Sequence, residues 1–177
     1  MEFFASADDE RFRATLRTWL AANRPGRSER IPHDDASLAD EFAFLTAWQR
    51  RLHAAGFVGL LWPRAYGGHD GPPTQQAILN EELARARAPQ LINRVGINNV
   101  APTLILHGTD AQKTRLLPRI LTADEIWCQL FSEPNAGSDL AAVRTRAERD
   151  GDQFVVNGQK VWTSYAQFST WAILLAR

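Results

Sequence analysis

The chain has 177 residues, 45% hydrophobic and 23% charged, so it can fold around a packed core. Basic and acidic side chains both number 20, which leaves no net charge to attract nucleic acid or an anionic membrane. The single cysteine, Cys128, excludes an internal disulfide and fits a reducing compartment. The N-terminus resembles no signal peptide, and no stretch of ~18 apolar residues is present. We therefore expect a cytoplasmic protein without a membrane span.

Helical patterns fill roughly the first two thirds of the chain. The predicted helices cover residues 6–23, 37–55, 74–87, 89–107 and 109–121, with a polar loop at 27–36. Ser6 with Asp9, and Thr109 with Gln112, form capping boxes at the first and last of these helices. Thr74 is the expected cap of the third helix, and Pro118 is expected to kink or shorten the fifth.

After about Thr122 the pattern changes from helices to strands. The strand candidates are 126–131, 143–148, 154–156, 161–163 and 171–175, with turns at 150–152 and 157–158. The fold class is therefore α+β: an all-α domain at 1–123, followed by an incomplete antiparallel β-domain at 124–177. The apolar strand at 171–177 is expected to favour edge-to-edge association unless something covers it.

Two sequence blocks in the second part carry the chemical signal. The first block, residues 128–139, reads CQLFSEPNAGSD, an apolar strand that runs into a turn of small residues. The second block, residues 157–164, reads NGQKVWTS. A short hairpin is expected to bring its Trp and a nearby hydroxyl residue back toward the turn of the first block. Such parts suit a flat ring that needs hydrogen bonds at its edge, and a phosphate near exposed backbone N–H groups.

In sequence, order and spacing, the two blocks resemble the flavin-binding signatures of the acyl-CoA dehydrogenase family. The resemblance covers essentially the whole chain, and it implies an FAD-dependent oxidoreductase that desaturates an acyl-CoA thioester between its α and β carbons. It also implies an electron-transfer flavoprotein as electron acceptor and a homo- or hetero-oligomeric assembly. The family's C-terminal helical bundle and catalytic base would lie beyond Arg177, so no catalytic residue is assigned in this chain.

The resemblance assigns the candidate site residues. The expected cofactor-binding residues are Gln129, Phe131, Ser132, Gly137, Ser138, Trp162 and Ser164. The expected substrate-binding residues are Ser138, Ile97, Val100 and Leu104. Several of these residues have a plainer alternative. Ser132 could satisfy backbone groups, residues 135–139 could be an ordinary loop, and Trp162 could be a core aromatic. Core packing is the favoured role of the three helical residues.

Other polar residues are given no role in the site. Asn135 stands where relatives usually carry Gly, a change that an αL position tolerates. Glu133 is rejected as the base because the Glu-Pro pair is structural in relatives. The four histidines, at 33, 53, 69 and 107, have no metal-site spacing, so no metal is expected.

The sequence is also compatible with two further functions. One is a flavin monooxygenase or oxidase of the same fold, acting on a substrate without CoA. The other is a truncated, non-catalytic chain that at most binds flavin or pairs with a full-length partner. Fold alone does not choose between them, and the 177 residues by themselves are expected to lack dehydrogenase activity.

Overall fold

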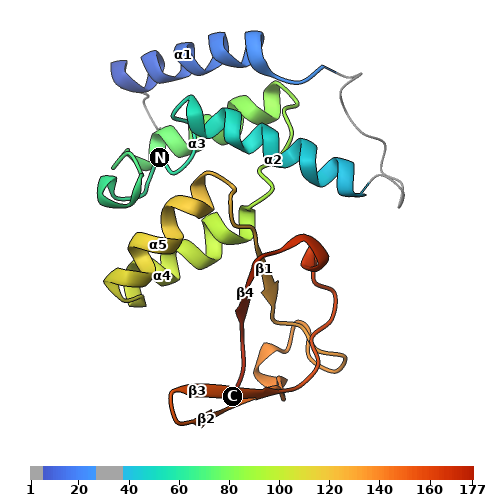
Figure 1. Ribbon diagram of the computed structural model, residues 1–177. Coiled ribbons are helices and arrows are strands. Elements are labelled where there is room, and N and C mark those ends of the chain that lie inside the picture. Colours follow the sequence, from blue (N-terminus) through green and yellow to red (C-terminus); the bar gives the residue numbers. More distant parts are fainter. Residues whose placement is uncertain (1–5, 27–37) are drawn as a thin grey trace.

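The computed structural model describes residues 6–26 and 38–177, with the helices at one end and the strands at the other (Figure 1). The helices are α1 (Ala7–Asn23), α2 (Leu38–Ala54), α3 (Pro73–Arg85), α4 (Ala101–His107) and α5 (Asp110–Leu121). The strands are β1 (Trp127–Leu130), β2 (Arg146–Asp150), β3 (Gln153–Asn157) and β4 (Trp171–Leu174). A π-helical segment, η4 (Gly96–Val100), precedes α4, and short 3-10 turns lie at η3 (Arg64–Tyr66), η5 (Leu140–Ala142) and η6 (Ala166–Phe168). The predicted fold class is confirmed.

Both predicted capping boxes form. The Ser6 hydroxyl accepts a hydrogen bond from the Asp9 N–H at 3.1 Å, and the Asp9 carboxylate accepts one from the Ser6 N–H at 3.0 Å. Thr109 and Gln112 make the same exchange at the start of α5. Pro118 does not shorten α5, which continues to Leu121 because four apolar side chains around the proline are buried. The predicted loop at 27–36 and the predicted helix start at Ser37 lie outside the described residues.

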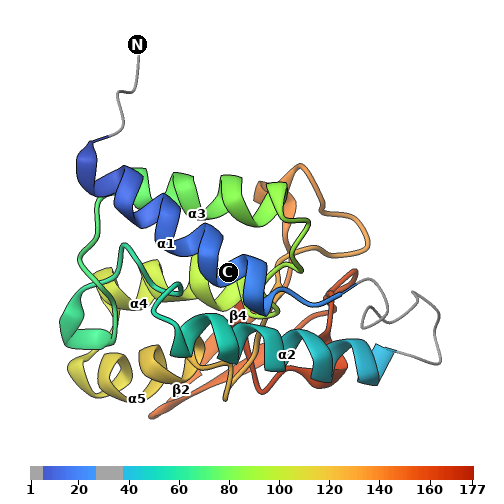
Figure 2. The same ribbon diagram turned by 90° about the horizontal axis from the view of Figure 1, so that it is seen from above.

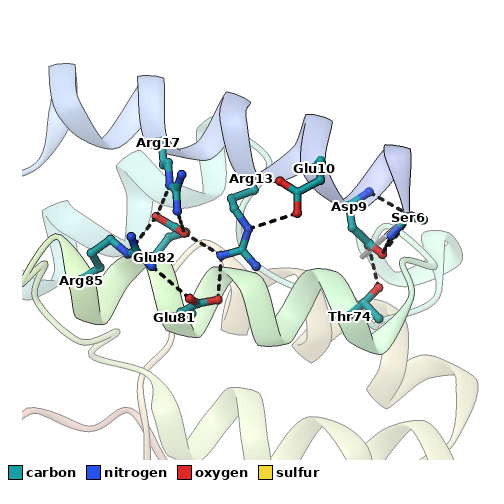
Figure 3. A network of polar contacts seen from close by, with 9 residues as sticks. All are labelled: Ser6, Asp9, Glu10, Arg13, Arg17, Thr74, Glu81, Glu82 and Arg85. Carbon is teal, nitrogen blue, oxygen red and sulfur yellow. Dashed lines mark hydrogen bonds and ion pairs between the residues drawn. The ribbon is translucent and has the colours of Figure 1, made fainter. Parts of the chain in front are cut away.

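The predicted cap of α3 is wrong. Pro72 is the N-cap residue and makes no side-chain capping bond, whereas Thr74 lies inside the helix. The Thr74 hydroxyl instead donates to Asp9 Oδ1 at 2.7 Å, so it joins α3 to the start of α1 (Figure 3). Proline has no backbone N–H, so a proline in the first helical turn needs no capping bond. Thr74 is therefore available for this contact between the two helices.

A second polar contact joins α1 and α3, which run side by side (Figures 2 and 3). The Glu82 carboxylate is 2% exposed and accepts hydrogen bonds from Arg13 at 2.7 Å and from Arg17 at 2.8 Å. Glu81 bonds Arg13 and Arg85 at the rim. The hydrogen bond from Arg17 lowers the pKa of Glu82, so the buried carboxylate stays charged and paired.

Apolar side chains from all five helices form the main core. Its fully buried members include Leu16, Trp48, Leu52, Leu117, Ile120 and Leu121. Trp48 also donates its indole N–H to the Pro89 carbonyl at 2.9 Å. Among the described residues, no helix is both long and apolar enough to cross a membrane.

Two amide side chains with 0% exposure, Gln49 on α2 and Asn93 before η4, lie within this core. Gln49 accepts a hydrogen bond from the Asn93 N–H at 3.0 Å and donates to the carbonyls of Ile120 and Leu121, both at 3.1 Å. The pair therefore connects α2 to the end of α5 and to the chain that leads into η4.

The Asn93 side chain extends this connection to the strands. Its amide nitrogen donates to the carbonyls of Ile120 at 3.0 Å and Glu125 at 2.9 Å, and its oxygen accepts from the Trp127 N–H at 3.0 Å. The helix predicted from Pro89 begins only after Asn93, because the chain here is held by these side-chain bonds. Asn93 thus places the first residue of β1 against the helical core.

The strands form two pairs. β2 and β3 are antiparallel, as predicted, whereas β1 and β4 pair in parallel from Trp127 with Trp171 to Leu130 with Leu174. The parallel pairing arises because the β2–β3 hairpin and the 158–170 segment carry the chain back to the starting end of β1. The last described residue is also paired, since Arg177 exchanges backbone hydrogen bonds with Thr145 at 2.8 Å and Ala147 at 2.7 Å. The strand expected to be bare at 171–177 is therefore partly covered.

The predicted strand at 161–163 does not form. Trp162 has a φ of 60°, in the left-handed region, which a strand cannot contain. Neighbouring bonds explain this conformation: the Val161 N–H donates to the Ser132 carbonyl at 3.0 Å, and Lys160 is tied to Glu133. The segment therefore packs against the end of β1 as an irregular chain.

Replacing Asn93 by Leu should remove about 2 kcal/mol or more from the free energy of unfolding, because the buried Glu125 carbonyl and the part-buried Trp127 N–H each lose a partner worth roughly 1–3 kcal/mol. Urea unfolding followed by circular dichroism measures this loss. Asn80→Leu is the matched control, since Asn80 is an exposed asparagine on α3. An Asn93→Leu loss no larger than that of the control would contradict the role assigned to Asn93.

Candidate functional site

The two sequence blocks lie side by side in the fold. The Val161 N–H donates to the Ser132 carbonyl at 3.0 Å, and the Lys160 ammonium donates to the Phe131 carbonyl at 2.9 Å. Hydrogen bonds to backbone carbonyls therefore hold together residues that are 29 positions apart in the sequence. The structure brings Ser132 of the first block next to the chain that carries Trp162 of the second.

A buried ion pair fixes this arrangement. Lys160 and Glu133 are 2.8 Å apart, with side chains that are 7% and 8% exposed. Glu133 also accepts the backbone N–H groups of Arg144 at 2.7 Å and Thr145 at 2.9 Å. The hydrogen bond from Lys160 is the largest of the effects that lower the pKa of Glu133 to about 2. A carboxylate with so low a pKa and with both oxygens occupied holds the chain together and is unsuited to act as a base.

Sequence reasoning missed Lys160. A signal was present, because Lys160 is one of only two lysines in a chain that otherwise uses arginine, and it lies inside the second block. An ammonium on a flexible stem can donate to two acceptors at once, here a carbonyl and a carboxylate. Its partner 27 residues earlier could not be read from the local pattern.

The turn of the first block leaves hydrogen-bond donors unused. Glu133 and Ala136 exchange backbone bonds at 2.8 and 3.1 Å, which closes a tight turn after β1. The next residues, Gly137 and Ser138, are exposed, and their N–H groups bond to no described residue. A Cβ added to Gly137 would meet nothing within 4 Å. Adjacent free N–H groups with open space around them suit an anionic group such as a phosphate.

Trp162 does not lie in the core. Its side chain is 91% exposed, so the alternative of a packed core aromatic does not hold. Ser164 is also exposed, and Ser132 is half-buried, with no bond from either hydroxyl to a described residue. The irregular chain at 161–164 thus presents a flat aromatic surface at Trp162 and, at Ser164, a hydroxyl group that has no partner within the described residues.

The three helical candidates belong to the main core. Val100 is 3% exposed, and Ile97 and Leu104 are half-buried against the same cluster. None of the three lines the cavity of about 670 Å³ that lies between α2 and the start of β1. Core packing, the role that the sequence favoured for them, describes their observed positions.

A cavity of about 670 Å³ lies between α2, the segment before and within η4, the start of β1, and Ser164 with Tyr165. Of the predicted site residues, only Ser164 lines it. The cavity is joined to the first block by Asn99, whose amide nitrogen donates to Gln129 Oε1 at 2.7 Å. Thr163 donates its hydroxyl hydrogen to the Gln129 carbonyl at 3.4 Å, so Gln129 is held by η4 through Asn99 and by the second block through Thr163.

Acid should weaken the fold through Glu133. A carboxyl whose folded pKa is depressed stabilises the fold fully above its unfolded pKa of about 4.5, and this contribution is lost as the pH falls toward about 2. Glu133→Gln should therefore flatten the pH dependence of the urea midpoint below pH 4.5, down to the lowest pH at which the chain stays folded. The matched control is Glu148→Gln, since Glu148 is 69% exposed. Equal slopes for wild type and Glu133→Gln would refute this assignment.

Comparison with known sequences covers both parts of the chain. Residues 6–124 match the acyl-CoA dehydrogenase N-terminal domain, and residues 128–177 match the acyl-CoA dehydrogenase middle domain. The acyl-CoA dehydrogenase IpdE1 of Mycobacterium tuberculosis is 48% identical over 172 residues, which are 96% of this chain and 45% of that protein.

Solved structures agree with this match. A chain of the ChsE4–ChsE5 complex from Mycobacterium tuberculosis superposes with a TM-score of 0.82 at 37% identity, covering 100% of this chain and 44% of that one. A chain of the Tcur3481–Tcur3483 steroid acyl-CoA dehydrogenase gives a TM-score of 0.78 at 34% identity, covering 100% and 45%. The present chain thus spans less than half of the length of these relatives. On these matches, together with the fold, the chain belongs to the acyl-CoA dehydrogenase family.

Proposed function

We propose that the chain is the N-terminal and middle part of an FAD-dependent acyl-CoA dehydrogenase, an oxidoreductase that introduces a double bond between the α and β carbons of an acyl-CoA thioester. One observation carries the proposal. Lys160 and Val161 hold the two blocks together, while the Trp162 indole and the N–H groups of Gly137 and Ser138 stay accessible. A rigid frame with unused donors is what a tightly bound ring-bearing dinucleotide requires.

The residues present fit FAD. Trp162 offers a flat apolar surface for the ring, and the hydroxyls of Ser132 and Ser164 can donate to or accept from its polar edge. Gly137 and Ser138 offer free N–H groups for a phosphate. The flavin, when bound, supplies the two-electron acceptor for the reaction.

Gln129 and Phe131 contribute through their backbone. Their carbonyls are held by Thr163 and Lys160, which fixes the chain on which Ser132 is carried. We assign both residues to the cofactor site for this positioning role. Ser138 carries one of the two free N–H groups, and we assign it to the phosphate of the cofactor or to the CoA portion of the substrate.

The reaction also needs a base for the weakly acidic α proton and hydrogen bonds to the thioester oxygen. Glu133 is paired with Lys160 and cannot serve. We propose that the base comes from the part of the family fold that this chain does not span. An electron-transfer flavoprotein would take the electrons, and the reaction would take place in the cytoplasm.

A second candidate is a partner-dependent subunit that binds flavin without catalysing the reaction alone. One observation favours it: two of the related structures are complexes of differently named chains. In both candidates we propose that the chain works within an oligomer.

The proposal predicts flavin in the protein purified from its own host with any chain that co-purifies. Trp162→Ala should weaken FAD binding by up to about tenfold, because ring–aromatic contacts contribute roughly 0.5–1.5 kcal/mol. Fluorescence titration of the apoprotein with FAD measures this change. Phe154→Ala is the control, since Phe154 is a 65% exposed aromatic outside both blocks.

Two outcomes separate the candidates. Loss of flavin absorbance when an acyl-CoA is added without oxygen indicates a dehydrogenase, whereas unchanged absorbance of bound flavin favours the non-catalytic subunit. A purified protein that binds no FAD, or a Trp162→Ala variant with unaltered affinity, would contradict the assigned site.

A further inference from the structure

The segment that carries Trp162 and Ser164 is held by hydrogen bonds at its two ends. At its start, bonds from residues 160–163 join it to the end of β1, and the last of these is long, at 3.4 Å. At its far end, the N–H groups of residues 170 and 171 both donate to the Ile126 carbonyl, at 2.9 and 3.2 Å. Trp162 and Ser164 themselves are exposed. The position of Ser164 therefore depends on what holds the turn that follows it.

Two residues of this segment have a backbone conformation that side chains disfavour. The φ angle is 60° at Trp162 and 57° at Tyr165, and both values lie in the left-handed region. A residue other than glycine keeps such a conformation only where the surrounding structure holds it, and such residues are concentrated at functional sites. The contacts of Tyr165 and of the turn after it are therefore needed to maintain the segment in its observed form.

Phe42, near the start of α2, supplies these contacts. Its ring stacks on the ring of Phe168, with centroids 4.8 Å apart and planes 27° apart, and it meets the Tyr165 ring at 6.2 Å. The turn η6, drawn in red, accordingly lies next to α2 (Figures 1 and 2). Within the described part of the chain, no other aromatic ring pairs with a ring of residues 161–168.

Hydrogen bonds inside the turn connect the two rings that Phe42 contacts. The Tyr165 carbonyl accepts from the Phe168 N–H at 3.0 Å and from the Ser169 hydroxyl at 2.9 Å. Tyr165 also packs against a small buried cluster formed by Ile92, Ala123 and Ile126. Tyr165 and Phe168 therefore form one unit, which packs on α2 and directly follows Ser164.

On the basis of the proposed function, we propose that Phe42 is a positioning residue for the cofactor. By holding Phe168 and Tyr165, it places the Trp162 indole and the Ser164 hydroxyl for contact with the flavin ring. Aromatic pairs stabilise a structure beyond the effect of their buried area. A site that is assembled in only a fraction of the molecules binds its ligand more weakly by that fraction. Loss of the Phe42 ring therefore weakens flavin binding through the turn.

The first measurement needs no flavin. The protein is purified from its own host with any chain that co-purifies, freed of flavin, and followed by hydrogen exchange and mass spectrometry. The N–H groups of Phe168 and Ser169 donate to carbonyls within the turn at 3.0 and 3.3 Å. Phe42→Ala should raise their exchange rates by up to about tenfold, because loss of the ring pair releases the turn. Exchange in the β2–β3 hairpin should stay unchanged.

The second measurement is FAD binding to the same preparations. Phe42→Ala should weaken the affinity by up to about tenfold and change the visible circular dichroism of the bound flavin. The dichroism reports the surroundings of the flavin ring, which a general loss of stability does not alter. Phe42→Tyr retains the ring and should restore the exchange rates, the affinity and the dichroism.

Phe12→Ala is the matched control. Phe12 is a half-buried aromatic on α1, and its ring meets that of Phe57 at 6.0 Å within the helical part of the molecule. This variant should lower the unfolding temperature while leaving the exchange of Phe168 and Ser169 and the affinity for FAD intact. Thermal unfolding shows that each variant is folded.

The outcomes separate this role from the function on which it rests. Wild-type exchange in folded Phe42→Ala, or faster exchange with unaltered FAD affinity and dichroism, would overturn the positioning role and leave the flavin site standing. Equal effects of Phe12→Ala and Phe42→Ala on the turn and on FAD would also overturn it. If wild type binds no FAD, the proposed function fails and the cofactor role of Phe42 fails with it, whereas the exchange rates still decide whether Phe42 holds the turn.

Discussion

The structure depends on one buried amide contact, the hydrogen bond between Gln49 and Asn93 at 3.0 Å. Both side chains are fully buried, so each must find partners for its remaining polar atoms. Those partners are backbone groups at the end of α5 and at the start of β1, which meet only when all of these elements are in place. The contact therefore sets the position of the strands relative to the helices.

The same constraint shapes the candidate site. Because Asn93 is fixed, position 96 has room only for glycine, since a Cβ there would come within 2.5 Å of Asn93 Oδ1. The π turn that follows brings Asn98 and Asn99 to the rim of the cavity. With Trp127 fixed, β1 leads the first block to the buried pair of Glu133 and Lys160, which binds the second block. The paired residues hold the two blocks together, and the N–H groups of Gly137 and Ser138 stay free of partners within the described residues.

Local patterns were predicted well from the sequence. The capping boxes at Ser6 and Thr109 formed as expected, because both partners of each bond lie within one helical turn. Failures involved bonds between distant segments. Thr74 looks like a cap in sequence but bonds Asp9, and the segment at 161–163 has strand-like composition but is held in another conformation by Ser132 and Glu133.

The sequence by itself determined the family resemblance, the order of helices before strands, and the two blocks, because these depend on residue types at short spacing. Only the tertiary structure decided that β1 and β4 pair in parallel, that Lys160 joins the blocks, that Trp162 is exposed, and that Asn98 lines a cavity. The physical reason is the same in each case. Hydrogen bonds and burial act between groups that are close in space, and for these residues the partners are tens of positions away in the chain.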